Sequence, residues 1–275
     1  MKTQKTLFLA WQDTESRSWF PIGRLTFDGA RYKFVYTQGV KEAQQMCSFS
    51  PLSSFPHLEK VYTSTHLFPV FSNRLMSRSR PDYANFLQWL NISDHEDDPL
   101  TILARSSGKR ETDSLTVFPC PQPDAAGQYQ LHFFAHGLRH LPESAIERIN
   151  RLRPEEKLWL AHASCCKSGD SSNALAHEFQ NPHDSQALTL HTEDHYIVGY
   201  CPRYLRSEVF ELLCQDPSSV DLRVERVNLP PTPFQFRLLC RITALSKDDF
   251  RPFSGKEYQP LIKEDVATAS LISPP

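Results

Sequence analysis

The chain has 275 residues, of which 40% are hydrophobic and 23% charged, with 30 Lys and Arg against 32 Asp and Glu. This composition excludes fibrous, largely disordered and disulfide-dense small proteins, and the net charge of −2 excludes a broad electrostatic grip on nucleic acid or anionic membrane. No apolar run is long enough to span a bilayer, and Leu7–Trp11 is too short for a secretory signal. We therefore expect a cytoplasmic protein with no membrane partner, in which any contact with nucleic acid is local.

The seven cysteines contain no CxxC pair, which predicts reduced thiols. Cys165 and Cys166 are adjacent, and His162 and His177 lie nearby in the sequence. Adjacent cysteines can both bind a metal, but tetrahedral sites more often space their ligands by two to four residues. Two free thiols in a loop are the favoured interpretation, and a zinc ion on these four residues is the alternative. We expect no cofactor.

Prolines indicate the domain boundaries. The chain has 21 prolines and only 9 glycines. A proline-rich linker at 119–128 disfavours helix and central strand. It separates a first unit at 1–118 from a second unit at 129–246. The tail at 247–275 lacks a periodic pattern, so we expect most of it to be extended or disordered.

The first unit opens with strand patterns and continues with helical ones. Residues 32–37 alternate with period two, and Asp28-Gly29 between two such runs indicates a hairpin. Asp82 suits a helix N-cap, and Asp97-Asp98-Pro99 places acids and proline in the first turn of another helix. We expect strands at 7–11, 19–27 and 32–37, and helices at 83–90 and 97–104.

The second unit mixes short strands with two helices. Pro142 suits a first helical position, and Pro154 ends the helix that starts there. We expect strands at 129–135, 158–160, 187–191, 196–200, 220–227 and 234–245, with the second helix at 204–214. This order suits a small barrel capped by helices, so the predicted fold class is α+β, mostly β.

The most specific pattern in the chain is Glu178-Phe179-Gln180-Asn181-Pro182-His183-Asp184, followed by Val198-Gly199-Tyr200-Cys201-Pro202-Arg203. This pair resembles the HIRAN domain, whose pattern is an acidic residue, Asn-Pro-aromatic-Asp, and then Gly-Tyr-x-Pro with a basic residue. The resemblance runs from Phe133 to about Leu245 and implies a small OB-like β-barrel. In helicase-like transcription factors this family binds the free 3′ end of single-stranded DNA. The resemblance therefore implies a nucleic-acid-binding module for single-stranded DNA or DNA ends.

The chemistry of these residues suits an end pocket. The carboxylate of Asp184 can accept a hydrogen bond from a ribose hydroxyl, Arg203 can balance a phosphate, and Tyr200 offers a flat face for a base. By resemblance, Phe134 takes a base-stacking position, and His183 replaces the commoner tyrosine. The alternative is that the turn residues only stabilise a turn and that Tyr200 belongs to the core. The candidate nucleic-acid-binding residues are Phe134, Asn181, His183, Asp184, Tyr200 and Arg203.

Charge and an internal repeat refine this hypothesis. Residues 129–215 hold 8 Lys and Arg against 11 Asp and Glu, whereas a groove that tracks a long strand is positive. A pocket for one end needs only one or two cations.

Leu160-Ala161-His162 recurs as Leu175-Ala176-His177, so we expect 163–177 to be an inserted loop.

The first unit is similar to the N-terminal subdomain of HipA-type kinases. The similarity lies in Pro21–Phe27, Tyr32–Tyr36 and Phe71-Ser72-Asn73-Arg74-Leu75; the family reads Gly-x-Leu, a Tyr-containing strand, and Phe-Phe-x-Asn-Leu-Leu-Pro. The kinase core is absent, and neither a phosphate-cradling loop nor a hydrolase motif occurs, so we expect no enzyme. The alternative function is a non-catalytic, antitoxin-like regulatory subunit that docks a HipA-type kinase.

Overall fold

The chain divides into two compact units. The computed structural model describes residues 5–93, 95–161, 187–215, 220–245 and 251–262. The first unit comprises Met1–Gln88, Ile92–Pro121 and Arg251–Pro275, and the second comprises Trp89–Asn91 and Gln122–Phe250. The boundary at Pro121 lies inside the predicted linker. The sequence pattern did not predict that Trp89–Asn91 belongs to the second unit or that Arg251–Pro275 belongs to the first. Within the described ranges, no helix is both long and apolar enough to cross a membrane.

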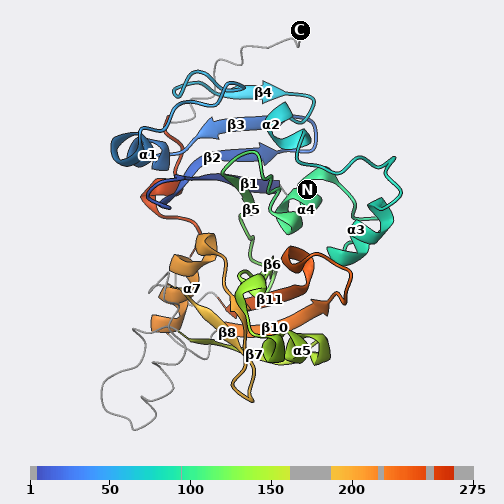
Figure 1. Ribbon diagram of the computed structural model, residues 1–275. Helices are drawn as coiled ribbons and strands as arrows, with labels where there is room; N and C mark the ends of the chain where they lie inside the picture. Colours follow the sequence, from blue (N-terminus) through green and yellow to red (C-terminus); the bar gives the residue numbers. More distant parts are fainter. Residues whose placement is uncertain (1–4, 94, 162–186, 216–219, 246–250, 263–275) are drawn as a thin grey trace. The chain divides into compact units, whose positions relative to one another are not determined.

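The first unit is built on one antiparallel sheet (Figure 1). Its strands are β1 (Lys5–Gln12), β2 (Trp19–Phe27), β3 (Tyr32–Tyr36), β4 (Tyr62–Ser64) and β5 (Leu115–Pro119). Its helices are α1 (Gly39–Cys47), α2 (Pro69–Ser72), α3 (Tyr83–Trp89) and α4 (Pro99–Ser106). The strand order is β4-β3-β2-β1-β5. The Asp28 carboxylate accepts the backbone N–H of Ala30 and of Arg31, both at 2.8 Å, which stabilises the turn between β2 and β3.

Aromatic side chains dominate the core of the first unit. The rings of Phe34 and Phe55 stack with centroids 3.9 Å apart, and both side chains are fully buried. The Tyr36 hydroxyl donates to the carbonyl of Phe55 at 2.8 Å and accepts the N–H of Leu52 at 2.9 Å. Burial raises the pKa of Tyr36 to about 12. This tyrosine therefore stays neutral and fixes the loop after α1 to the sheet.

Part of the predicted tail belongs to this core. Phe253 and Tyr258 are buried, and their rings contact each other and the ring of Phe8. The N–H of Leu261 donates to the carbonyl of Tyr36 at 2.8 Å, which ties the segment to β3. The segment includes the short 3₁₀-helix η5 (Lys256–Tyr258). The predicted tail therefore includes a docked segment at 251–262, because two aromatic side chains pack there.

The second unit is a curled antiparallel sheet (Figure 1). Its strands are β6 (Gln128–Phe134), β7 (Lys157–Ala161), β8 (Thr189–His191), β9 (Ile197–Tyr200), β10 (Val220–Val227) and β11 (Leu238–Leu245). The strand order is β6-β11-β10-β7-β8-β9. His136, just beyond β6, forms a β-bridge with Tyr200 at the end of β9. The two outer strands therefore meet at one residue pair, and the sheet curls into a half-barrel. With the first sheet, this confirms the predicted α+β, mostly β fold class.

Helices and short 3₁₀ turns complete the second unit. They are α5 (Glu143–Arg151), α7 (Arg203–Gln215), η1 (Leu138–His140) and η4 (Phe234–Phe236). Arg148 of α5 donates to Asp194 at 2.9 Å and to Glu156 at 2.6 Å, which joins the helix to the β8–β9 turn. The predicted strand at 234–245 starts only at Leu238, because Phe234–Phe236 form η4.

Asp98 caps α4 and gives a first testable prediction. Its carboxylate accepts the N–H of Leu100 at 3.1 Å and of Thr101 at 3.2 Å, and Lys5 donates to it at 2.7 Å. Desolvation raises the pKa of Asp98, but the hydrogen bonds from Lys5 and Thr101 outweigh it and the pKa is lowered. Asp98→Ala should lower the free energy of unfolding by about 1 kcal/mol at neutral pH.

The stability that the Asp98 cap contributes should decrease as the pH falls. Because the folded-state pKa of Asp98 lies below the ordinary value of an aspartate, the charged cap stabilises the fold at pH values above that ordinary pKa. The difference between the wild type and Asp98→Ala should shrink as the pH falls through the lowered pKa. Urea unfolding at neutral and at acid pH measures it. A difference that grows on acidification would contradict the assignment.

Candidate nucleic-acid interface

The structure describes half of the candidate residues. Phe134, Tyr200 and Arg203 lie within the described ranges. Asn181, His183 and Asp184 lie in 162–186, outside the described residues, as do the metal candidates His162, Cys165, Cys166 and His177 and the predicted inserted loop. Among the residues that are described, no group of three or more His, Cys, Asp or Glu could hold a metal ion.

The edges of the half-barrel meet around two glycines. The backbones of His136 and Tyr200 exchange two hydrogen bonds, at 2.9 and 3.0 Å. Gly137 has a φ of +78°, and a Cβ there would lie 2.6 Å from the Tyr200 ring. At Gly199, with a φ of +146°, a Cβ would lie 2.9 Å from that of Ala135. Only glycine permits this close approach, so the Gly-Tyr pair in the sequence builds the seam of the sheet.

Tyr200 and Arg203 stand at this seam. The Tyr200 ring covers Gly137 and is half-buried, and burial raises the pKa of its hydroxyl. Arg203 is exposed as the first residue of α7, three residues further along the chain. The end of β9 therefore carries a half-buried aromatic ring, that of Tyr200, and is followed by an exposed cation, Arg203.

Phe134 does not take the predicted role. The side chain is only 7% exposed, and its ring packs edge to face on Phe236 with centroids 5.3 Å apart. Trp89 stacks on the other side of this cluster, 6.1 Å from Phe236. The prediction that Phe134 stacks on a base is therefore corrected, because a buried ring has no open face for a ligand.

The structure brings further residues to the seam that the sequence reasoning missed. The turn η1 contacts both β9 and η4. On η1, Arg139 and His140 are exposed, and the Nε of Arg139 donates to Nε2 of His140 at 3.0 Å. On η4, Phe234 is 43% exposed, with the Arg237 guanidinium 5.2 Å from its ring centre. The signals were a Gly-Leu-Arg-His run after a strand and a proline-rich loop ending in an aromatic.

Three arginines of the second unit form ion pairs with carboxylates. Arg148 pairs with Asp194 and Glu156, Arg223 with Asp221, and Arg241 with Glu155 and Glu225. Arg139 differs, because in the described part of the chain its side chain is bound to a histidine and forms no ion pair. The seam therefore carries a positive charge that the protein itself does not cancel.

Comparisons with known proteins add little. No protein-family model and no curated protein matches the chain. A crystal structure of a protein from Lactobacillus plantarum is 17% identical, and the alignment covers 43% of this chain and 99% of that chain with a TM-score of 0.28. A likeness of this size carries no argument about fold or function.

Proposed function

We propose that the second unit binds the end of a single-stranded nucleic acid at the seam of its half-barrel. The observation that supports this proposal best is the grouping of Tyr200, the η1 turn and η4 where the sheet edges meet. Cations and an exposed aromatic ring in one place are the two elements that a single strand needs. The HIRAN-like sequence pattern points to the same residues at Tyr200 and Arg203.

The proposed roles follow from exposure and charge. Arg139 and Arg203 are exposed cations that would hold the terminal phosphates. Phe234 would stack on a base, in place of the buried Phe134. Its ring is already backed by Arg237, so stacking needs little side-chain ordering. Few cations are involved, so the affinity should depend only weakly on salt, with a slope of about one or two counterions.

Binding of short labelled oligonucleotides tests the proposal by fluorescence anisotropy. Arg139→Gln and Arg203→Gln should each weaken binding about tenfold, since a charge-assisted hydrogen bond contributes about 1.5–3 kcal/mol. Phe234→Ala should weaken it by a similar factor, since stacking contributes about 1–3 kcal/mol per base. Arg223→Gln is the control, because this arginine pairs with Asp221 on β10.

The predicted preference for a free 3′ end over a phosphorylated one is tested by comparing the binding of 3′-hydroxyl and 3′-phosphate oligonucleotides. The sequence predicts that Asp184 accepts a hydrogen bond from the terminal hydroxyl and repels a terminal phosphate. Asp184→Ala should therefore remove a preference for the open end, whereas Arg203→Gln should weaken both kinds of end alike. If the wild-type protein binds neither, the proposal fails, and docking of a HipA-type kinase becomes the leading alternative.

A further inference from the structure

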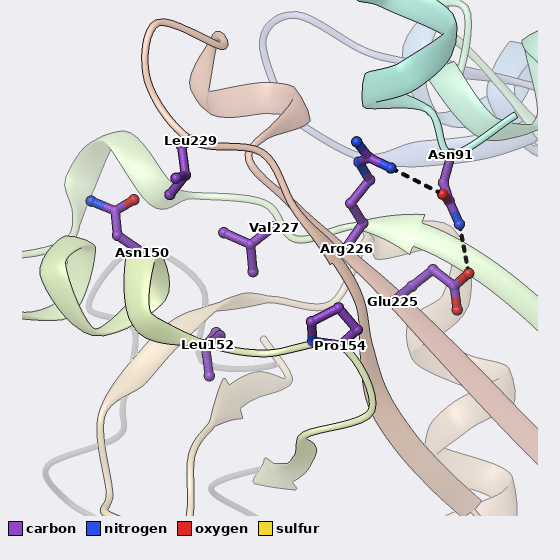
Figure 2. A pocket seen from close by; sticks show the side chains of 8 residues that line it. All are labelled: Asn91, Asn150, Leu152, Pro154, Glu225, Arg226, Val227 and Leu229. Carbon is purple, nitrogen blue, oxygen red and sulfur yellow. Dashed lines mark hydrogen bonds between the residues drawn. The ribbon is translucent and has the colours of Figure 1, made fainter.

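A pocket of the second unit lies outside the interface described above. Its volume is about 390 Å³, which falls in the range of small-molecule sites, roughly 300–1,000 Å³. Figure 2 shows Arg226 and Asn91 on one side of the pocket and Asn150 and Leu229 on the other. The lining is completed by Leu152, Pro154, Glu225 and Val227.

Arg226 lines this pocket and Arg237 contacts the lining residue Asn150, and in the described part of the chain neither arginine has a carboxylate partner. In the described part of the chain, Arg226 donates only to amide oxygens, of Asn228 at 2.9 Å and of Asn91 at 3.3 Å. Arg237 is 6% exposed and donates to the Thr232 carbonyl and, at 3.4 Å, to Asn150 Oδ1. Burial lowers the pKa of Arg237 because these neutral acceptors do not offset the loss of water.

This arrangement contrasts with six other arginines of the protein. Ion pairs with carboxylates hold Arg74, Arg78, Arg80, Arg148, Arg223 and Arg241. A half-buried or buried guanidinium is normally compensated in this way. Arg226 lacks such a partner in the described part of the chain, so an anion that entered the pocket would meet a guanidinium that only amide oxygens bind.

The acidic residue at the pocket does not remove this charge. Glu225 accepts from Arg241 at 2.9 Å and from the Asn91 amide at 2.8 Å, and His132 lies 3.6 Å away. Arg241 is shared with Glu155, at 2.7 Å. Glu225 and Glu155 are thus engaged by Arg241 and, for Glu225, by Asn91, and in the described part of the chain neither carboxylate bonds to Arg226.

The remaining lining residues indicate the shape and polarity of the ligand that the pocket fits. Val227, Leu152 and Pro154 form an apolar wall between the two polar sides, and Leu229 is 56% exposed beside it (Figure 2). The oxygen of Asn150 accepts from Arg237, so the amide N–H groups of Asn150 are the atoms that could donate to a ligand acceptor. The pocket therefore fits a flat apolar body with a hydrogen-bond acceptor at one end and an anion at the other.

We propose that this pocket binds a nucleoside 5′-phosphate group, with the phosphate on Arg226 and the base against Leu229, Val227 and the Asn150 amide. A sugar phosphate would leave the apolar wall uncovered, and a nucleoside would leave Arg226 uncompensated. The group can come from a free mononucleotide or from the 5′-phosphorylated end of a nucleic acid. The inference goes beyond the proposed function, since it needs neither the η1 turn nor Arg203.

Isothermal titration calorimetry of the full chain tests it with the four nucleoside monophosphates, adenosine and inorganic phosphate. At least one monophosphate should bind, and adenosine and phosphate should each bind at least about tenfold more weakly, because a charge-assisted contact contributes about 1.5–3 kcal/mol. Arg226→Gln should weaken the monophosphate about tenfold, and Leu229→Ala by a smaller factor. Arg223→Gln and Arg203→Gln should not change it.

The outcomes separate this proposal from the previous one. Monophosphate binding that is lost in Arg203→Gln but kept in Arg226→Gln would place the ligand at the seam and overturn the proposal. Equal binding of adenosine and its monophosphate, or no binding at millimolar concentration, would also overturn it. Competition by a 5′-phosphorylated dinucleotide would support it and identify a nucleic-acid end as the source, and absence of that competition would support a free nucleotide.

A folding control accompanies Arg226→Gln. The glutamine keeps a donor for the oxygens of Asn91 and Asn228, so the melting temperature should stay close to that of the wild type. If the variant is unfolded, Leu229→Ala and Asn150→Ser carry the test instead. If both variants keep the full affinity for the monophosphate, the proposal that it binds in this pocket is refuted.

Discussion

Replacing Arg74 by alanine should lower the free energy of unfolding of the first unit by about 1.5–3 kcal/mol, the range for hydrogen bonds to a charged group. Its side chain is 2% exposed and donates to the carbonyls of Val70 and Gly108, both at 2.8 Å, and to Asp113 at 2.6 Å. One guanidinium thus joins α2 to the loop that leads into β5. Alanine would leave two carbonyls and a carboxylate without their donor.

Native-state hydrogen exchange of the β1–β3 amides measures this effect for the first unit by itself. The matched control is Arg80→Ala, because Arg80 pairs with Asp82 at 2.8 Å but its side chain is 58% exposed. An exposed pair contributes only about 0–1 kcal/mol, so this variant should exchange almost like the wild type. Similar protection in the two variants would show that Arg74 does not hold the loop.

Gly137→Ala should destabilise the second unit by about 2–5 kcal/mol. The φ of +78° costs an alanine about 1–2 kcal/mol, and a Cβ 2.6 Å from the Tyr200 ring adds an overpacking cost of about 1–3 kcal/mol. The ring would have to move, so the variant should also weaken nucleic-acid binding at the seam.

Gly127→Ala separates the two costs. Gly127 has a φ of +76°, nearly that of Gly137, but a Cβ there meets no atom within 4 Å. It should therefore lose only the backbone cost, about 1–2 kcal/mol. Urea unfolding of both variants gives the difference, which belongs to the Tyr200 contact. Equal losses would mean that the ring yields freely and that the seam is not tightly packed.

The predicted elements with a clear period are present in the structure. The strands β1, β2 and β3, the helices α3 and α4, and the strand β10 match the alternating or capped segments of the sequence. The short elements α2, β4 and β5 were missed, because segments of three to five residues give at most a weak periodic signal. The nine-residue helix α1 was missed for want of a capping side chain, since Gln38 forms no cap hydrogen bond.

The candidate site was predicted only in part. Gly199 and Tyr200 form the seam, and their sequence neighbourhood is specific enough to single them out. Phe134 was misplaced because a strand pattern says which residues share a face but not what covers it. In the structure, Phe236 packs against the Phe134 ring, and Phe236 comes from a segment distant in sequence.

The sequence by itself determined the α+β class, the two-unit division near Pro121 and the hairpin at Asp28, since these rest on local periodicity, proline and turn chemistry. Tertiary structure decided which charges remain available. Arg139, Arg226 and Arg241 look alike in the sequence, yet only Arg241 meets carboxylates. Pairing across the curled sheet sets these partners, and the free energy of an arginine depends on its partners and burial, which no local pattern encodes.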